Sequence, residues 1–170
     1  MKIGLELIGT VLDELRAAED YFGEPQQEEA STFEEMYPMI SDENLASWKS
    51  SRGTYKKMPV VPGSLRALDI ISQKHEICGI TSISGRLMNT IAGYLISNGI
   101  AITDVSHTKN KDIRAGLSKI DIFIESDAES ARELSKVCRV IILDKPYNRF
   151  GAGDVDRAHS WDEILELIND

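Results

Sequence analysis

Short apolar segments alternate with helical patterns along most of this 170-residue sequence, and this alternation limits the possible folds more than any other feature. The apolar segments are rich in β-branched residues, which favour strands. They span residues 2–8, 76–81, 120–125, 139–143 and, more weakly, 100–105. Helical periodicity separates them, at residues 65–74, 86–98, 111–117, 128–136 and 161–168. The pattern predicts an α/β fold in which helices cover both faces of a parallel sheet.

Residues 13–58 interrupt this alternation. They are acidic, contain Gly23, Pro25 and Pro38, and predict helices joined by loops. We therefore expect a core domain formed by residues 1–12 and 59–170, and a small, mainly helical cap formed by residues 13–58. An insertion after the first strand can cover the carboxyl edge of the sheet, where open α/β sheets bind ligands. Its aromatic residues predict either a partner surface or a small core of the cap itself: Phe33, Tyr37, Trp48 and Tyr55.

Composition narrows the classes of function. The formal charge of −9 argues against binding to nucleic acid but permits a small anionic ligand held by local donors. No apolar run approaches the roughly 20 residues that a membrane span needs, and the amino end begins with a strand pattern rather than a signal peptide. Cys78 and Cys138 lie in apolar segments, which is typical of buried, reduced thiols. We expect a cytoplasmic protein that binds neither nucleic acid nor membranes.

Several short motifs follow one another in the order and spacing of a known family. The first apolar segment runs into Gly9-Thr10, and Lys111 precedes Asp121 by ten residues. Longer motifs are Pro-Val-Val-Pro-Gly-Ser-Leu-Arg-Ala-Leu at 59–68, Asp-Ile-Phe-Ile-Glu at 121–125 and Asp-Lys-Pro-Tyr-Asn-Arg at 144–149. Together they resemble the haloacid-dehalogenase (HAD) superfamily, in particular the 5′(3′)-deoxyribonucleotidases and their bacterial relatives. The resemblance implies a Rossmann-like core with a small helical cap inserted after the first strand.

In that family an aspartate attacks phosphorus and forms an aspartyl-phosphate, while Mg²⁺ offsets charge on the phosphoryl oxygens. The resemblance implies catalytic roles for Glu6, Thr81 and Lys111. It implies phosphate contacts from Gly9, Thr10, Thr81, Ser82 and Lys111. It implies metal ligands from Glu6, the backbone carbonyl of Ile8, Glu125 and Asp127.

The chain departs from the family at three of its functional positions. Glu6 stands where the family has its nucleophilic aspartate, and the extra methylene displaces the carboxylate in a site where about 1 Å can cost roughly 100-fold in rate. Ile8 replaces the second aspartate, which transfers protons, and general acid–base help of this kind contributes about 10²–10⁴-fold. Ser126 stands where the family has a metal-binding acid, and Asp127 follows one residue later.

The residues themselves also leave simpler interpretations open. Glu6 can ligate a metal, or it can form a salt bridge with Lys111. Residues 81–85 can form an anion-binding turn, or they can cap the next helix. Tyr147 and Arg149 can contact a nucleotide, or they can hold the last helix in place.

We therefore expect a catalytically degenerate nucleotidase-like protein, or pseudoenzyme. It would bind a nucleotide, a small phosphorylated metabolite or another protein, and its Mg²⁺ site would be degraded. The alternative is an active Mg²⁺-dependent 5′-nucleotidase or small-molecule phosphatase that uses Glu6 as its nucleophile. A third interpretation is a structural subunit that assembles, with itself or with a partner, through the acidic cap.

Overall fold

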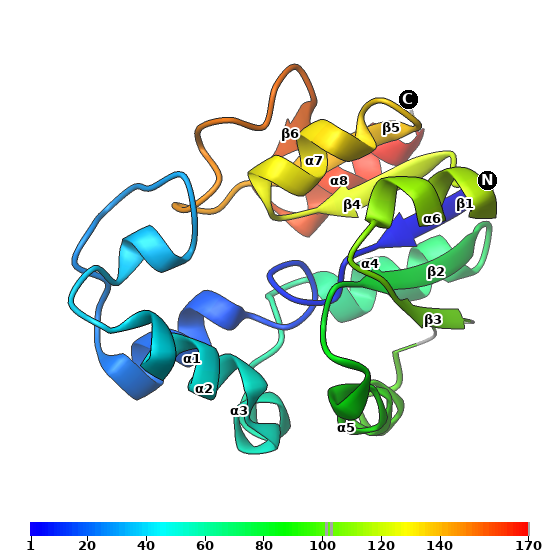
Figure 1. Ribbon diagram of the computed structural model, residues 1–170. Coiled ribbons are helices and arrows are strands. Elements are labelled where there is room, and N and C mark those ends of the chain that lie inside the picture. Colours follow the sequence, from blue (N-terminus) through cyan, green and yellow to red (C-terminus); the bar gives the residue numbers. More distant parts are fainter. Residues whose placement is uncertain (101, 103, 170) are drawn as a thin grey trace.

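The computed structural model describes residues 1–100, 102 and 104–169. Within these residues, six parallel strands form one sheet in the order β3-β2-β1-β4-β5-β6 (Figure 1). The strands are β1 (Lys2–Leu5), β2 (Glu76–Thr81), β3 (Asp104–His107), β4 (Ile122–Glu125), β5 (Arg139–Leu143) and β6 (Asp156–Ala158). The expected α/β fold class is confirmed.

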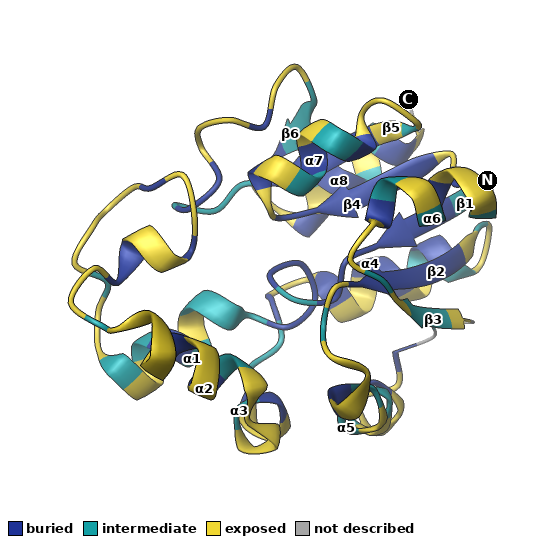
Figure 2. Cartoon of the chain, in the orientation of Figure 1, coloured by how far each residue is buried: buried dark blue, intermediate teal, exposed yellow. Residues whose placement is uncertain are grey.

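Helices cover both faces of the sheet, as a parallel sheet requires. One face packs against α4 (Ser64–Ser72), α5 (Gly85–Ser97) and α8 (Trp161–Asn169), and the other against α6 (Lys111–Ser118) and α7 (Ala128–Leu134). Successive residues of a strand point to opposite faces, so in β5 Ile141 joins the first core and Ile142 the second. Figure 2 shows the resulting pattern, with the central strands buried and the covering helices partly buried and partly exposed.

Three of the expected strands have other bounds in the structure, and one further strand was not expected. β4 begins at Ile122 rather than at residue 120. β1 ends at Leu5 rather than at residue 8, because Glu6 accepts hydrogen bonds from the next two backbone N–H groups and turns the chain out of the sheet. β3 spans Asp104–His107 rather than residues 100–105, and residues 101 and 103 of the expected strand lie outside the described residues. β6 was not expected, since its three residues, Asp-Arg-Ala, carry no apolar pattern.

Residues 13–58, here called the cap, contain α1 (Glu14–Phe22), the 3₁₀ helix η1 (Glu34–Met36), α2 (Asp42–Ser50) and α3 (Arg52–Lys57). Phe33, Tyr37 and Trp48 are buried together in a cluster of the cap, whereas Tyr55 is buried in the main core. The four aromatic residues therefore form core rather than a partner surface. The division into two domains at the bounds given above stays a prediction.

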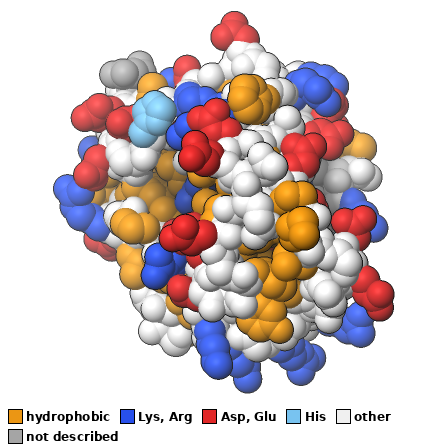
Figure 3. All heavy atoms as spheres, turned by 90° about the vertical axis from the view of Figure 1, so that its left-hand side faces the viewer, with side chains coloured by type: hydrophobic (Ala, Val, Ile, Leu, Met, Phe, Trp, Pro, Cys, Tyr) orange, Lys and Arg blue, Asp and Glu red, His pale blue; other side chains and the backbone are white. Residues whose placement is uncertain are grey.

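The chain enters and leaves the cap at neighbouring points. The Asp13 N–H donates to the Pro59 carbonyl at 2.7 Å, and the Val61 N–H donates to the Val11 carbonyl at 2.8 Å. The cap faces the carboxyl ends of the strands (Figure 1), and Figure 3 shows apolar and acidic side chains on its outer side. Among the described helices, none has the length and apolar character needed to cross a bilayer.

Candidate functional site

Two buried glutamates lie side by side at the carboxyl edge of the sheet. β1 and β4 are neighbours, with Leu5 opposite Ile124, so Glu6 and Glu125 emerge at the same level. Their side chains accept hydrogen bonds in the same way, each from the backbone N–H groups of the next two residues. The Glu6 Oε1 contacts are 2.7 and 3.2 Å, and the Glu125 Oε1 contacts are 2.8 and 3.2 Å. These N–H groups hold one oxygen of each carboxylate in a fixed position.

Lys111, the first residue of α6, lies between the remaining oxygens of the two carboxylates. Its Nζ is 2.5 Å from Glu6 Oε2 and 2.8 Å from Glu125 Oε2, and the side chain is 7% exposed. Burial acts to lower the pKa of Lys111, but the carboxylates of Glu125 and Glu6 outweigh it and raise this pKa. Burial raises the pKa of Glu125, and Lys111 opposes that shift. The centre of the site is thus a buried ammonium between two carboxylates.

A second contact closes the floor of the site. The Ser126 hydroxyl donates to the Ile8 carbonyl oxygen at 3.1 Å. The turn that brings these groups together contains Gly9 at φ 82°, where a Cβ would lie 2.2 Å from Ser126 Oγ and 2.7 Å from the Tyr147 hydroxyl. Only glycine fits this turn, both for its backbone conformation and for its lack of a side chain.

The residues expected to hold Mg²⁺ do not fit a divalent cation. Glu6 and Glu125 direct their oxygens at Lys111 and at backbone N–H groups, and the Ile8 carbonyl receives Ser126. Asp127 accepts from the Ser130 N–H at 2.7 Å and thereby caps α7. In the described part of the chain, no three His, Cys, Asp or Glu side chains are grouped so as to hold a metal. Mg²⁺ needs near-octahedral oxygen ligands, and this arrangement does not offer them.

The residues expected to hold phosphate divide into two groups. Ser82 and Lys111 line a common pocket with Glu6. Thr10 and Thr81 are fully buried beneath it: the Thr10 hydroxyl donates to the Glu6 carbonyl, and Thr81 Oγ1 accepts from the Ile83 N–H at 3.3 Å. The Gly9 N–H donates to the Leu12 carbonyl at 2.8 Å. Most donors of the expected phosphate cradle are therefore already used within the protein.

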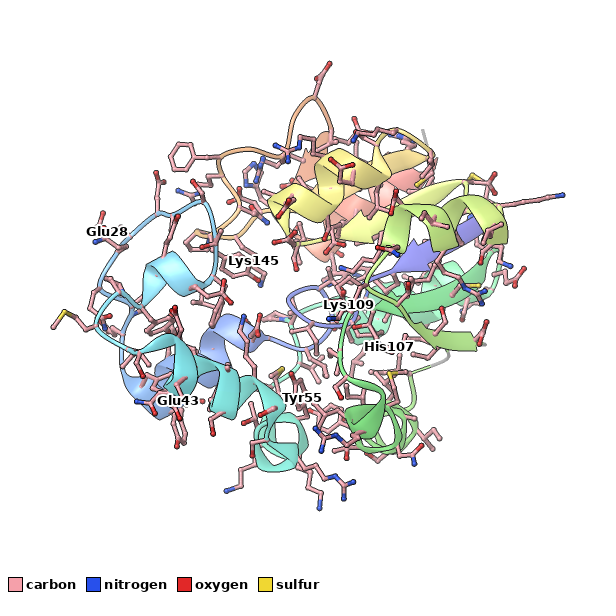
Figure 4. The ribbon with its side chains drawn as sticks, viewed as in Figure 1. Glu28, Glu43, Tyr55, His107, Lys109 and Lys145 are labelled. Carbon is pink, nitrogen blue, oxygen red and sulfur yellow. The ribbon has the colours of Figure 1, made fainter. Side chains whose placement is uncertain are left out.

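The pocket itself is a cavity of about 600 Å³ between the sheet edge and the cap. The cap contributes residues that the sequence motifs did not indicate, namely Glu14, Phe33, Glu34, Lys49 and Tyr55. They come from η1, the three cap helices and the residue before η1, so no sequence spacing connects them. Figure 4 places the labelled Tyr55 beside the core, whereas Glu28 lies on an outer loop of the cap.

The loop of residues 144–149 joins this site to the cap. Asn148 is fully buried and donates to the carbonyls of Ser126 and Leu143 at 2.7 and 2.8 Å. The Ala30 N–H donates to the Pro146 carbonyl at 2.9 Å, and Arg149 forms an ion pair with Glu29. The rings of Tyr147 and Phe33 meet edge to face, with centroids 5.6 Å apart. Through these contacts the loop holds the cap to the core.

Comparisons with known proteins agree with this architecture. The model of the family described as 5′ nucleotidase, deoxy (pyrimidine), cytosolic type C protein (NT5C) matches residues 6–170. A search of curated protein sequences found no match.

Solved structures of hydrolases and dehalogenases share the fold. One is an L-2-haloacid dehalogenase from Xanthobacter autotrophicus with chloropropionic acid covalently bound (TM-score 0.63, 8% identity, covering 99% of this chain and 98% of that chain). Another is a HAD-superfamily hydrolase, subfamily IA, from Geobacter sulfurreducens (TM-score 0.61, 16% identity, 99% and 96% covered). A third is a HAD-superfamily hydrolase from Ehrlichia chaffeensis (TM-score 0.59, 12% identity, 99% and 95% covered). At these identities the likeness concerns the fold alone.

Proposed function

Because this chain belongs to the 5′ nucleotidase, deoxy (pyrimidine), cytosolic type C family, we propose that it is a non-catalytic member that binds a small molecule between core and cap. The observation that carries the proposal is the position of Lys111, whose ammonium lies within 2.8 Å of both site carboxylates. The family description also supports a cytoplasmic location. Binding of a protein partner or of a second copy of the chain stays a prediction.

A nucleophilic role for Glu6 would require a carboxylate oxygen that is free to attack. Glu6 Oε1 accepts two backbone N–H groups and Oε2 contacts Lys111, so attack would break contacts that hold the buried charge. The residue two positions on is Ile8, which can neither donate a proton to a leaving group nor activate water. At the two family positions on this turn, the described site thus offers neither a free nucleophile nor an acid–base partner.

The way in which charge is neutralised in this site also differs from that in sites of metal-assisted phosphoryl transfer. There, a divalent cation neutralises the phosphoryl oxygens in the transition state. Here Lys111 neutralises the protein's own carboxylates, and the described residues offer no metal-binding group. These contacts support the proposal that the chain has lost phosphatase activity, rather than the alternative that it performs the same reaction with Glu6 as its nucleophile.

The test compares phosphate release by the wild type, by Glu6→Gln and by the triple variant Glu6→Asp/Ile8→Asp/Ser126→Asp. Each protein is assayed with Mg²⁺, a panel of nucleoside monophosphates and an aryl phosphate. We expect no release by the first two proteins and a gain of activity in the triple variant, because it restores the family's acids. Turnover by the wild type that disappears in Glu6→Gln would overturn the proposal and favour an active phosphatase that uses Glu6. If the folded triple variant gains no activity, this would indicate that the pocket no longer contains an intact phosphate-binding site.

A further inference from the structure

A second cavity opens on the cap, apart from the pocket at the sheet edge. Its volume is about 860 Å³, and residues of α1, α2 and α3 line it together with Ile40. None of its lining residues lines the pocket at the sheet edge. The helix α2 contributes to both, since Trp48 lines the second cavity and Lys49 lines the pocket. This second cavity, here called the cap groove, has no part in the proposed function.

Three aromatic rings in contact form the apolar part of the cap groove. The Tyr21 ring meets the Phe22 ring edge to face at a centroid distance of 4.7 Å, and its centroid lies 6.4 Å from that of Trp48. Trp48 is buried, whereas Tyr21 is 70% exposed. Met39, which precedes the lining residue Ile40, is 82% exposed. Apolar side chains that are exposed together and bordered by polar groups are typical of surfaces that bind a protein.

The side of the cap groove formed by α3 is basic. This helix carries Arg52, Lys56 and Lys57, and Lys57 lines the groove itself. All three side chains are exposed, and within the described part of the chain none of them forms an ion pair. Figure 3 shows Lys and Arg side chains gathered below the apolar ones on the outer side of the cap. The α3 side therefore presents positive charge that no carboxylate of the chain contacts.

The side formed by α1 and the start of α2 is acidic. Asp20 lines the groove from α1, and it pairs with Arg16 of the same helix at 3.4 Å. Both side chains are more than half exposed, and such pairs on a helix surface contribute little. The helix α2 begins with Asp42 and Glu43, at its end away from α3, and neither forms an ion pair among the described residues. This side can therefore still attract a positive charge.

A surface that carries both signs of charge suits contact with a second copy of itself. In a two-fold dimer the same surface of both chains meets, so the acidic side of one chain must face the basic side of the other. The cap groove meets this condition, because Asp20 and Lys57 line the same cavity from different helices. A peptide of one charge sign would be attracted by one side and repelled by the other. The charges therefore favour a second copy of this chain as the occupant.

We propose that two copies of the chain associate through their cap grooves about a two-fold axis. Tyr21 of each copy lies in the groove of the other, and the acidic side of each groove faces the basic α3 side of the other. The inference does not rest on the proposed function, because no residue that lines the groove also lines the pocket. It assigns a definite surface to the assembly that the sequence predicted through the acidic cap.

Analytical ultracentrifugation of the full chain over a range of concentrations measures the association. We expect a reversible equilibrium between monomer and dimer that weakens at high salt, because salt screens charges on exposed surfaces. Tyr21→Ser should raise the dissociation constant of the dimer at least about tenfold. The control is Phe150→Ser, which removes a ring that is 54% exposed in the loop between β5 and β6 and should leave the dissociation constant unchanged.

An exchange of charges tests the orientation of the two copies. Asp20→Lys/Glu43→Lys makes the acidic side basic, and Lys56→Glu/Lys57→Glu makes the α3 side acidic. All four residues are exposed, so both variants should fold, and circular dichroism checks this. Each variant alone brings like charges together at both contacts, so its dimer should be at least about tenfold weaker than that of the wild type.

An equimolar mixture of the two exchange variants should form a heterodimer about as stable as the wild-type dimer. Opposite charges then face each other at both contacts, and adding Tyr21→Ser to either variant should weaken this heterodimer too. A wild-type chain that stays monomeric up to about 1 mM would overturn the inference. A dimer that Tyr21→Ser and Phe150→Ser affect equally, or a mixture of exchange variants that does not associate, would overturn it as well.

Discussion

Lys111 Nζ lies 2.5 Å from Glu6 Oε2, and both side chains are buried at the carboxyl edge of the sheet. The sequence left open whether Glu6 ligates a metal or pairs with this lysine, and the structure contains the ion pair. With Glu125 on the other side of the ammonium, the protein supplies the counter-ion of its site from its own chain.

Replacing this lysine should strongly destabilise the fold. Lys111→Met leaves the carboxylates of Glu6 and Glu125 buried without a cation, and breaking a buried pair in this way costs about 3–5 kcal/mol. Urea unfolding measures the loss. The control is Lys109→Met, since Lys109 is exposed and should change stability by less than about 0.5 kcal/mol. A loss below about 1 kcal/mol for Lys111→Met would contradict this account of the site.

Asn148 should matter as much as a core residue although it is polar. Its amide group donates to the Ser126 and Leu143 carbonyls and accepts from the Lys145 N–H at 3.0 Å. Asn148→Ala leaves these buried groups unpaired, and we expect it to cost about 3 kcal/mol or more in thermal unfolding. Asn44→Ala, on an exposed face of α2, should be nearly neutral. Similar melting temperatures for the two variants would show that the loop does not hold the site together.

Two tyrosines should respond in opposite directions to loss of their hydroxyl groups. The Tyr37 hydroxyl is buried without a hydrogen-bond partner among the described residues, so Tyr37→Phe should stabilise the protein by about 1 kcal/mol. The Tyr55 hydroxyl donates to the Lys49 carbonyl at 2.7 Å, so Tyr55→Phe should destabilise it by a similar amount. Urea unfolding of both variants at pH 7 tests the pair. Destabilisation by Tyr37→Phe would mean that its hydroxyl has a partner after all.

Cys138 should react slowly below pH 11. Burial raises the pKa of its thiol to about 11, so at pH 8 only about one thiol in a thousand is the reactive thiolate. Alkylation by iodoacetamide should therefore rise about tenfold per pH unit between pH 8 and 10. Mass spectrometry of Cys78→Ser, in which Cys138 is the remaining cysteine, measures the rate. The urea-unfolded variant is the control, and equal rates in the folded and unfolded protein would contradict the raised pKa.

Most of the sheet could be predicted because its strands are apolar on both faces. The range 76–81 is β2 and the range 139–143 is β5, each without a shift of either end. β6 has no such pattern, since an edge strand of three residues is defined by its neighbour β5 rather than by its own composition. The early end of β1 could not be predicted either, because it depends on the hydrogen bonds that the Glu6 side chain accepts from the backbone N–H groups of the next two residues.

The core side of the site was easier to predict than the cap side. Glu6, Ser82 and Lys111 follow or precede strands whose carboxyl ends meet at one edge, so their proximity follows from topology. Thr10 lies in the expected turn and Thr81 ends β2, but their hydroxyl groups bond to the backbone beneath the pocket, and sequence does not give side-chain direction. Glu14, Lys49 and Tyr55 reach the pocket only through the packing of the cap, which no spacing encodes.

The attachment of the cap has a mechanical consequence. The chain crosses between core and cap at two neighbouring points, near Asp13 and Val61, and two neighbouring points define a single axis of rotation. The loop of residues 144–149 contacts Ala30 and Glu29 at a distance from that axis, and so attaches the cap to the core at a third place. These contacts oppose a rotation of the cap about that axis. Such a rotation would have to break both the contacts of this short loop and the packing of α3 against α5.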